Sequence, residues 1–280
     1  MAFDGKFSKT FVRTGGLVSK GTPSRRMRQS TKGGAMIRRP EFDPRTVARE
    51  IPGLFDAVLP QLTPGVVSAF NRNAEHCQCE PISPEDVTGC ELQHAMLFEL
   101  GFAAGEMLIS SGSIDWDSCV SIAIERQRRH FDARIPERIP DHDREVALHV
   151  GENLAVMLKE LGGNNRPGAI VLTPPIPGFQ WVASGHGDFS IGKTLIEVKC
   201  AARNFSAPDY RQIAMYWLLS YAGAIESNQA EWSEGILLNP RNGRYVAFRF
   251  DEFLRIVSAG RTKVDILELF ASMVGTRGGI

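Results

Sequence analysis

Apolar and polar residues follow two different patterns along the chain, and the pattern changes near residue 140. Between residues 44 and 132 apolar side chains recur every three to four positions, which is typical of helices that bury one face. The predicted helices cover residues 47–62, 90–110 and 116–131. Pro136 and Pro140 then interrupt the chain. The sequence therefore predicts a mainly helical region over residues 42–140.

Residues 141–280 mix helical and strand-like patterns. The predicted helices cover residues 143–161, 208–224 and 251–273, and the predicted strands cover residues 169–173, 180–191, 194–200, 235–238 and 245–250. Gly162 and Gly163 provide a helix stop signal, and Asn242-Gly243 is typical of the tight turn of a hairpin. This succession predicts an α/β fold in which helices flank a central mixed β-sheet.

Residues 1–41 have no periodic apolar pattern and are rich in Gly, Ser, Thr and basic residues. Their clustered arginines are Arg25, Arg26, Arg28, Arg38 and Arg39. We expect a flexible basic arm that contacts nucleic-acid phosphates through these side chains. An organelle transit peptide and a solubilising tail are the alternatives.

Charge is distributed unevenly although the chain as a whole is neutral, with 32 Lys and Arg against 32 Asp and Glu. Residues 1–50 hold 12 basic and 4 acidic residues, which leaves 20 and 28 for the remainder. A segment of charge +8 thus precedes a remainder of charge −8. Zero net charge therefore does not exclude a nucleic-acid partner, because the position of the charges decides binding.

The composition is that of a globular protein, with 43% hydrophobic and 23% charged residues. Apolar runs stop well short of the roughly 20 residues of a membrane span, and the start lacks the apolar block of a secretory signal. We expect a cytoplasmic protein without membrane contact. His76, Cys77, Cys79, Cys90 and His94 suggest a zinc site, but the spacing of the first two cysteines is too short for the usual pair of ligands, so reduced cysteines are expected.

The most informative stretch for chemistry is residues 185–200. A strand over residues 194–200 places Leu195, Glu197 and Lys199 on one face. Ionised side chains seldom lie in such a strand unless they are paired or bind a metal, because desolvating a charge is costly. A turn at Gly192-Lys193 brings Asp188 alongside Glu197, which predicts a cluster of two carboxylates and one ammonium group.

Two neighbouring carboxylates repel each other unless a cation lies between them, and hard oxygen ligands suit Mg2+ or Mn2+. A lysine beside such a metal can orient the attacking water in phosphodiester hydrolysis. The alternative is a surface hairpin with one Glu–Lys cross-strand pair, and the tripeptide Glu197-Val198-Lys199 alone favours that alternative.

The wider context resembles the PD-(D/E)XK nuclease superfamily, in the order helix, strand, D-x8-E-x-K hairpin, helix and strand over residues 143–250. Asp188, Glu197 and Lys199 match its signature positions, and Gly187 stands where the superfamily has proline. The resemblance implies a restriction-endonuclease-like core. It also implies that Asp188, Glu197 and the main-chain carbonyl of Val198 bind the metal while Lys199 positions water.

Two further elements resemble the RecB-like and λ-exonuclease-like branch of that superfamily. Gln212 and Tyr216 match its Q-x3-Y element near the site, and Glu152 is the preferred match to a glutamate on the first core helix. The alternatives are a solvated helix face for Glu152, and helix surface and core for Gln212 and Tyr216. If these matches hold, all three side chains assist catalysis.

The resemblance implies a Mg2+- or Mn2+-dependent deoxyribonuclease that acts in DNA repair, recombination or defence against foreign DNA. Endonuclease or exonuclease action stays open, as does RNA as a substrate. The alternative is an inactive nuclease-like module that binds DNA or protein within a larger complex. Residues 1–140 lie outside the resemblance and are expected to engage substrate or a protein partner, with a second basic cluster at Arg126, Arg128 and Arg129.

Overall fold

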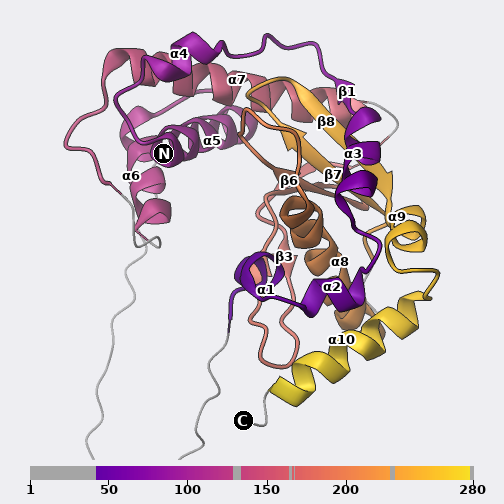
Figure 1. Cartoon of the computed structure of the whole chain (residues 1–280). Coiled ribbons are helices and arrows are strands. Elements are labelled where there is room, and N and C mark those ends of the chain that lie inside the picture. The colour runs from indigo at the N-terminus through magenta and orange to yellow at the C-terminus, as the bar shows by residue number, and fades with distance from the viewer. Residues whose placement is uncertain (1–41, 129–133, 164–165, 167, 228–230, 278–280) are drawn as a thin grey trace, which may run out of the picture. The chain divides into compact units, whose positions relative to one another are not determined.

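The computed structural model describes residues 42–128, 134–163, 166, 168–227 and 231–277 (Figure 1). Residues 39–280 form one compact unit. The predicted basic arm, with Arg25, Arg26, Arg28, Arg38 and Arg39, lies outside the described residues, as does Arg129. The fold that positions the candidate site is therefore that of residues 42–277.

A six-stranded mixed sheet forms the centre of this unit, in the order β1-β8-β7-β6-β5-β2. Its strands are β1 Glu75–His76, β2 Ile170–Leu172, β5 Phe189–Ile191, β6 Thr194–Val198, β7 Glu234–Asn239 and β8 Arg244–Arg249. β6 and β7 are parallel, and the other neighbours are antiparallel. A separate pair joins β3 (Pro175–Ile176) to β4 (Gly185–His186). The predicted α/β fold with a mixed sheet flanked by helices is confirmed.

Two long helices belong to hydrophobic clusters on the opposite faces of the sheet. Side chains of α7 (Asp141–Gly163) cluster with Ile196 and Ile236, whereas side chains of α8 (Ala207–Ser227) cluster with Leu195 and Leu237. The strand predicted over 194–200 is shorter than expected, because β6 ends at Val198 and Lys199 follows it. The predicted alternation of faces is present within β6, because its successive residues Leu195 and Ile196 enter different clusters. The crossover through α8 connects the parallel strands β6 and β7.

The helical region before α7 packs against both sides of this core. Its helices are α1 Pro44–Glu50, α2 Leu54–Val58, α3 Pro64–Arg72, α4 Pro84–Thr88, α5 His94–Ser110 and α6 Trp116–Gln127. Buried residues of α1 to α3 share a cluster with α8 and with the C-terminal helices α9 (Phe250–Val257) and α10 (Lys263–Arg277). α5 lies along α7. No helix within the described ranges is long and apolar enough to cross a membrane.

Two of the long helices predicted from periodicity are wrong in extent. The helix predicted over 47–62 is two helices, α1 and α2, separated at Pro52 and at Gly53, whose φ is 78°. The last helix divides into α9 and α10 around Ala259 and Gly260, whose φ values are 61° and 80°. Proline lacks a backbone donor and the left-handed conformation cannot continue an α-helix. The apolar period persists across each break because both halves bury a face in the same cluster.

Candidate active site

The hairpin β5–β6 brings Asp188 and Glu197 side by side. Phe189 pairs with Ile196, so the residues just beyond this pair are Asp188 on one strand and Glu197 on the other. Gly192 lies in the turn with a φ of 56°. The Asp188 carboxylate accepts a hydrogen bond of 2.7 Å from the backbone N–H of Val198, which fixes it against the end of β6. The predicted juxtaposition of the two carboxylates is therefore present.

Glu197 is buried, with only 2% of its surface exposed. Its Oε1 atom accepts hydrogen bonds from Lys199 Nζ at 2.6 Å and from Gln212 Nε2, whereas its buried Oε2 atom has no hydrogen-bond partner among the described residues. Burial and the charge of Asp188 raise the pKa of Glu197 to about 7, against the opposing effects of Lys199 and Arg45. Half of this carboxylate is thus unsatisfied in the protein alone.

Gln212 connects the strand that carries the charges to helix α8. Its Oε1 accepts from Lys199 Nζ at 2.9 Å, and its Nε2 donates to the hydroxyl of Tyr216 at 3.0 Å as well as to Glu197. Gln212 is 1% exposed, so these partners satisfy a buried amide. Burial and the charge of Glu197 raise the pKa of Tyr216. The Q-x3-Y pair, the lysine and the glutamate therefore form one hydrogen-bonded group.

Two arginines of α1 also act on this group, Arg49 through hydrogen bonds and Arg45 electrostatically, and neither is among the residues predicted for the site. Arg49 donates from one nitrogen to Asp209 Oδ1 at 2.8 Å and to Gln212 Oε1 at 3.3 Å. Arg45 lies one turn earlier on the same helix. Partial desolvation by itself would lower the pKa of Arg45. The negative charges of Glu197 and Asp188 outweigh that effect and raise the pKa. The available signal was their spacing of four residues, which places both on one helix face.

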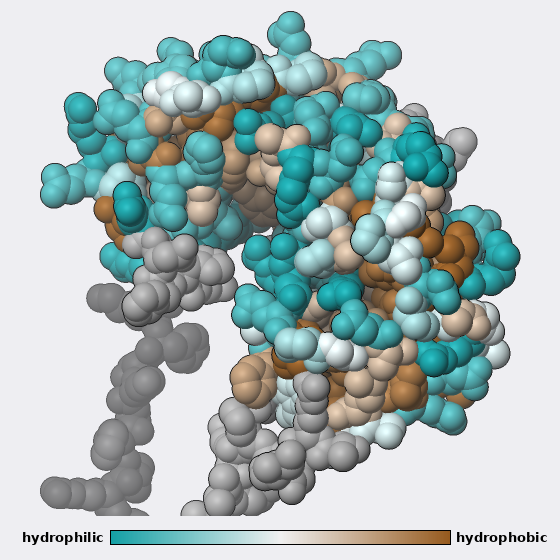
Figure 2. All heavy atoms as spheres, in the orientation of Figure 1, coloured by the Kyte–Doolittle hydropathy of each residue, from teal (hydrophilic) through white to brown (hydrophobic). Residues whose placement is uncertain are grey.

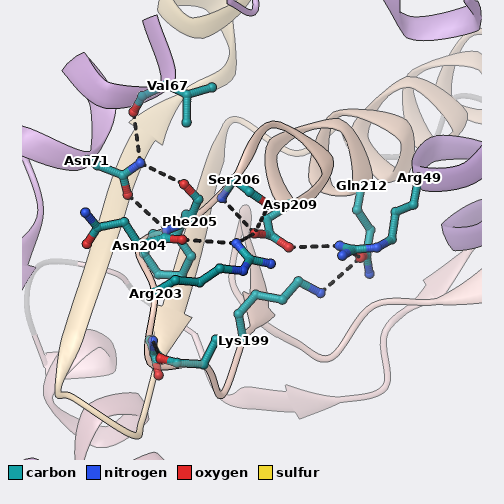
Figure 3. A network of polar contacts seen from close by, with 12 residues as sticks. Arg49, Val67, Asn71, Lys199, Arg203, Asn204, Phe205, Ser206, Asp209 and Gln212 are labelled. Atoms are coloured by element: carbon teal, nitrogen blue, oxygen red, sulfur yellow. Dashed lines mark hydrogen bonds and ion pairs between the residues drawn. The ribbon is translucent and has the colours of Figure 1, made fainter. Parts of the chain in front are cut away.

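Asp209, in the first turn of α8, fixes the loop that follows Lys199. It is 1% exposed and accepts hydrogen bonds from Ser206 N at 2.8 Å, Ser206 Oγ at 2.6 Å, Arg203 at 3.1 Å and Arg49 (Figure 3). Burial alone would raise the pKa of Asp209, but these bonds lower it to about 2. The loop is thereby held to both α8 and α1.

The network continues from this loop to α3. Asn71 donates to the carbonyl of Phe205 at 2.8 Å and accepts from its N–H at 3.1 Å (Figure 3). Beside it lies a cavity of about 520 Å³. Its lining residues are Pro64, Val67, Ser68, Asn71, Arg72, Asn204, Ser206, Ala207 and Arg244. The cavity lies next to the first turn of α8 rather than over Glu197, and its lining contains two arginines and no acidic residue.

Glu152, predicted to assist catalysis, lies exposed on α7. No hydrogen bond or ion pair joins it to another described residue. A different carboxylate, Glu106 on α5, is 8% exposed and forms an ion pair of 2.7 Å with Arg126. Burial raises the pKa of Glu106, and the charge of Asp188 adds to that rise. Glu106 lies on α5, outside the stretch that carries the family resemblance, so no motif in the sequence marks it.

The second basic cluster is only partly available to a ligand. One terminal nitrogen of Arg126 donates to both carboxylate oxygens of Glu106, at 2.9 and 2.7 Å. The other terminal nitrogen lies 3.7 Å from Glu99, and the guanidinium packs over the ring of Phe102 at 5.0 Å. Arg128 caps the end of α6. Arg126 is therefore engaged within the protein rather than displayed.

A divalent cation fits the carboxylate pair, because Mg2+ is commonly held by one or two carboxylates and completed by water and phosphate oxygens. The observation that bears on this is the unpartnered, buried Oε2 of Glu197 beside Asp188. Within the described ranges, no three His, Cys, Asp or Glu side chains gather closely enough to hold a metal by themselves. The residues present thus fit a water-rich Mg2+ or Mn2+ site better than a closed zinc site.

Comparisons of the chain with protein-family models, with curated proteins and with solved structures find no match. The arrangement of Asp188, Glu197, Lys199 and Gln212 must accordingly be interpreted from its own chemistry.

Proposed function

We propose that the protein is a Mg2+- or Mn2+-dependent deoxyribonuclease. The observation that carries the proposal is the buried Glu197, whose Oε1 contacts Lys199 and Gln212 while its Oε2 stays unpaired beside Asp188. A buried carboxylate oxygen without a hydrogen bond costs free energy of folding. Such atoms occur at sites that a bound ligand completes. A surface Glu–Lys pair would be exposed to water, whereas Glu197 is 2% exposed.

The order of elements supports the same proposal. α7, the hairpin β5–β6, α8 and β7 follow one another as in the PD-(D/E)XK superfamily, and the Asp, Glu and Lys positions fall at the end of this hairpin. We accordingly propose a restriction-endonuclease-like core for residues 141–280. Gly187 replaces the proline of the superfamily pattern, a position outside the charged cluster.

In this proposal Asp188, Glu197 and the main-chain carbonyl of Val198 would hold the metal. When bound, the metal supplies a more acidic water and offsets negative charge on the phosphoryl group. Lys199 positions the attacking water by donating a hydrogen bond from its ammonium group, which Gln212 orients through its Oε1. Hydrolysis forms a bond between the water oxygen and phosphorus and breaks the bond between phosphorus and the leaving sugar oxygen. The attacking water gives up a proton to solvent, and the leaving oxygen takes a proton from solvent.

The surface around the site supports an extended substrate. Figure 2 shows the surface hollowed between the helices α5 and α6 on one side and α1 on the other. Arg45 of α1 interacts electrostatically with Asp188, which directly precedes β5. The cavity with Arg72 and Arg244 lies beside the loop that follows Lys199. Basic groups next to a hollow suit a phosphate chain.

The first prediction tests the function itself. Plasmid and linear duplex DNA are incubated with Mg2+ and the wild-type protein, Glu197→Ala or Lys199→Ala. We expect cleavage by the wild type and a loss of at least about 100-fold in each variant, because each removes a group that acts on the transition state. Glu268→Ala and Lys159→Ala delete the same charges at exposed positions and serve as matched controls.

Equal cleavage by the wild type, Glu197→Ala and Lys199→Ala would contradict the assignment. Wild-type protein that binds DNA without cutting it in Mg2+ or Mn2+ would instead identify the alternative, an inactive nuclease-like binding module. Mn2+ titration calorimetry separates these cases further, since the binding module predicts no heat that depends on Glu197.

A further inference from the structure

Helix α1 carries two arginines whose surroundings differ. The Arg49 guanidinium is held by Asp209 and Gln212 at 2.8 and 3.3 Å. The Arg45 side chain is exposed, and no hydrogen bond or ion pair joins its guanidinium to another described residue. The Arg49 side chain is thus held by other residues of the fold, whereas the Arg45 guanidinium has no such partner among the described residues.

The packing of α1 on α8 places Arg45 on the same side of α1 as Arg49, which contacts α8. Val47 and Ala48 are buried in the cluster that contains the α8 core, which fixes the face of α1 that meets α8. Arg49 contacts Gln212. One helical turn back along α1 is Arg45, and one turn forward along α8 is Tyr216, whose hydroxyl receives a hydrogen bond from Gln212.

Electrostatics agrees with this register. The largest favourable influences on Arg45 come from Glu197, Asp188 and Tyr216, in that order. An arginine that stabilised the fold through these carboxylates would form an ion pair with one of them. The Arg45 guanidinium forms no such pair with a described residue, although the charges of Glu197 and Asp188 act on it.

A guanidinium in this position suits a phosphate. Its planar array of N–H groups can donate two parallel hydrogen bonds to phosphate oxygens, and it stays protonated at every physiological pH. A phosphate beside Asp188 and Glu197 needs a cationic neighbour, since the two carboxylates would otherwise repel it. Arg45 is the α1 side chain that supplies this charge without breaking an existing bond.

We infer that Arg45 binds the phosphate of the scissile DNA phosphodiester, so that α1 completes the active site of the nuclease core. The inference rests on the proposed nuclease function and deepens it. Arg45 donates to non-bridging phosphate oxygens, where negative charge accumulates during hydrolysis. Arg49 is a positioning residue, because it acts through Gln212 and Asp209.

The experiment compares Arg45→Met, Arg45→Lys and the control Arg255→Met, which removes one exposed arginine from α9. Steady-state cleavage gives kcat and KM for each protein. Fluorescence anisotropy gives the Kd for a short labelled duplex in Ca2+, a cation chosen to slow cleavage. We expect kcat/KM to fall about 10- to 100-fold in Arg45→Met, with part of it retained in Arg45→Lys. Arg255→Met should match the wild type.

The outcomes separate this inference from the function on which it rests. Cleavage by the wild type with Arg45→Met equal to Arg255→Met overturns the role of Arg45 and leaves the nuclease intact. Absence of cleavage by the wild type, with DNA binding weakened in Arg45→Met alone, overturns the nuclease and supports the phosphate contact. Absence of both cleavage and binding overturns both. Thermal melting shows whether Arg45→Met is folded, and Arg45→Lys provides the test if it is not.

Discussion

The side-chain amide of Gln212 makes hydrogen bonds to four different residues. Its amide oxygen accepts from Lys199 and Arg49, and its amide nitrogen donates to Glu197 and Tyr216. An amide offers a donor and an acceptor on one planar group, so no other neutral side chain of this size can serve both sides. The orientation of Lys199 therefore depends on a residue that does no chemistry.

Gln212→Leu tests this dependence. The change leaves buried polar partners unsatisfied, so we expect the free energy of unfolding to fall by about 1–3 kcal/mol and cleavage to fall with it. Urea unfolding measures the first effect and plasmid digestion the second. Tyr216→Phe removes only one hydroxyl from the same group and should cost about 1 kcal/mol. If Gln212→Leu and Tyr216→Phe lost the same stability and the same cleavage activity, Gln212 would not be the residue that orients Lys199.

Asp209 gives a pH dependence of stability whose sign follows from its pKa. That pKa is lowered from 3.8 to about 2, so the stabilisation is complete above pH 4 and is lost as the pH falls from 4 towards 2. Asp209→Asn should therefore lower the free energy of unfolding by about 2 kcal/mol at pH 7 and by progressively less below pH 4. Thermal melting across this range, with Glu268→Gln as the control, measures the difference. If the difference in stability between the wild type and Asp209→Asn did not narrow below pH 4, the lowered pKa of Asp209 would not be its cause.

At the scale of elements, the strands and helices with strong local signals were predicted well. The hairpin around Asn242-Gly243 and the hairpin that presents Glu197 both lie where their turn residues indicate. The break at Gly53 was not predicted, because the apolar period continues on both sides of it. The contact of Arg49 with Asp209 spans 160 residues, and a local pattern holds no information about such a distance. The sequence thus predicts the site residues that belong to one local motif, but it does not predict the contribution of α1.

The contact between α5 and α7 depends on glycines at positions where the helices nearly touch. A Cβ atom added to Gly105 would lie 2.8 Å from Leu154 Cδ2 and 3.1 Å from a backbone oxygen. Gly105→Ala should therefore destabilise the protein by about 1–3 kcal/mol despite the higher helix propensity of alanine. Gly162→Ala in α7 meets only Ile191 Cδ1 at 3.8 Å and should be neutral or stabilising. Chemical denaturation of both variants measures the contrast, and equal stability would mean that the helices can separate without loss.

At the scale of the whole molecule, the net charge of zero is the sum of a basic segment and an acidic remainder. The segment of residues 1–50 carries +8 and the remainder −8, and the remainder includes the carboxylates of the proposed metal site. Affinity for DNA should then depend strongly on the basic arm, whereas cleavage should depend on the unit of residues 39–280.

Deletion of residues 1–41 tests this division. We expect weaker DNA binding and a shallower dependence of log Kd on log salt concentration, because fewer counterions are released. A full-length variant with Arg25, Arg26, Arg28, Arg38 and Arg39 all changed to Gln keeps the length of the arm and should reproduce the effect. An unchanged salt slope in both proteins would show that the arm does not contact phosphates.

The edges of the sheet have a consequence for how the protein behaves in solution. The outermost strands, β1 and β2, have two and three residues, whereas the inner strands β7 and β8 have six each. Short edge strands offer few free N–H and C=O groups for pairing with another molecule. β1 comes from the helical region and covers the edge of β8. A fragment that kept only residues 141–280 would uncover this edge, and it would add strands from neighbouring copies instead of staying dispersed.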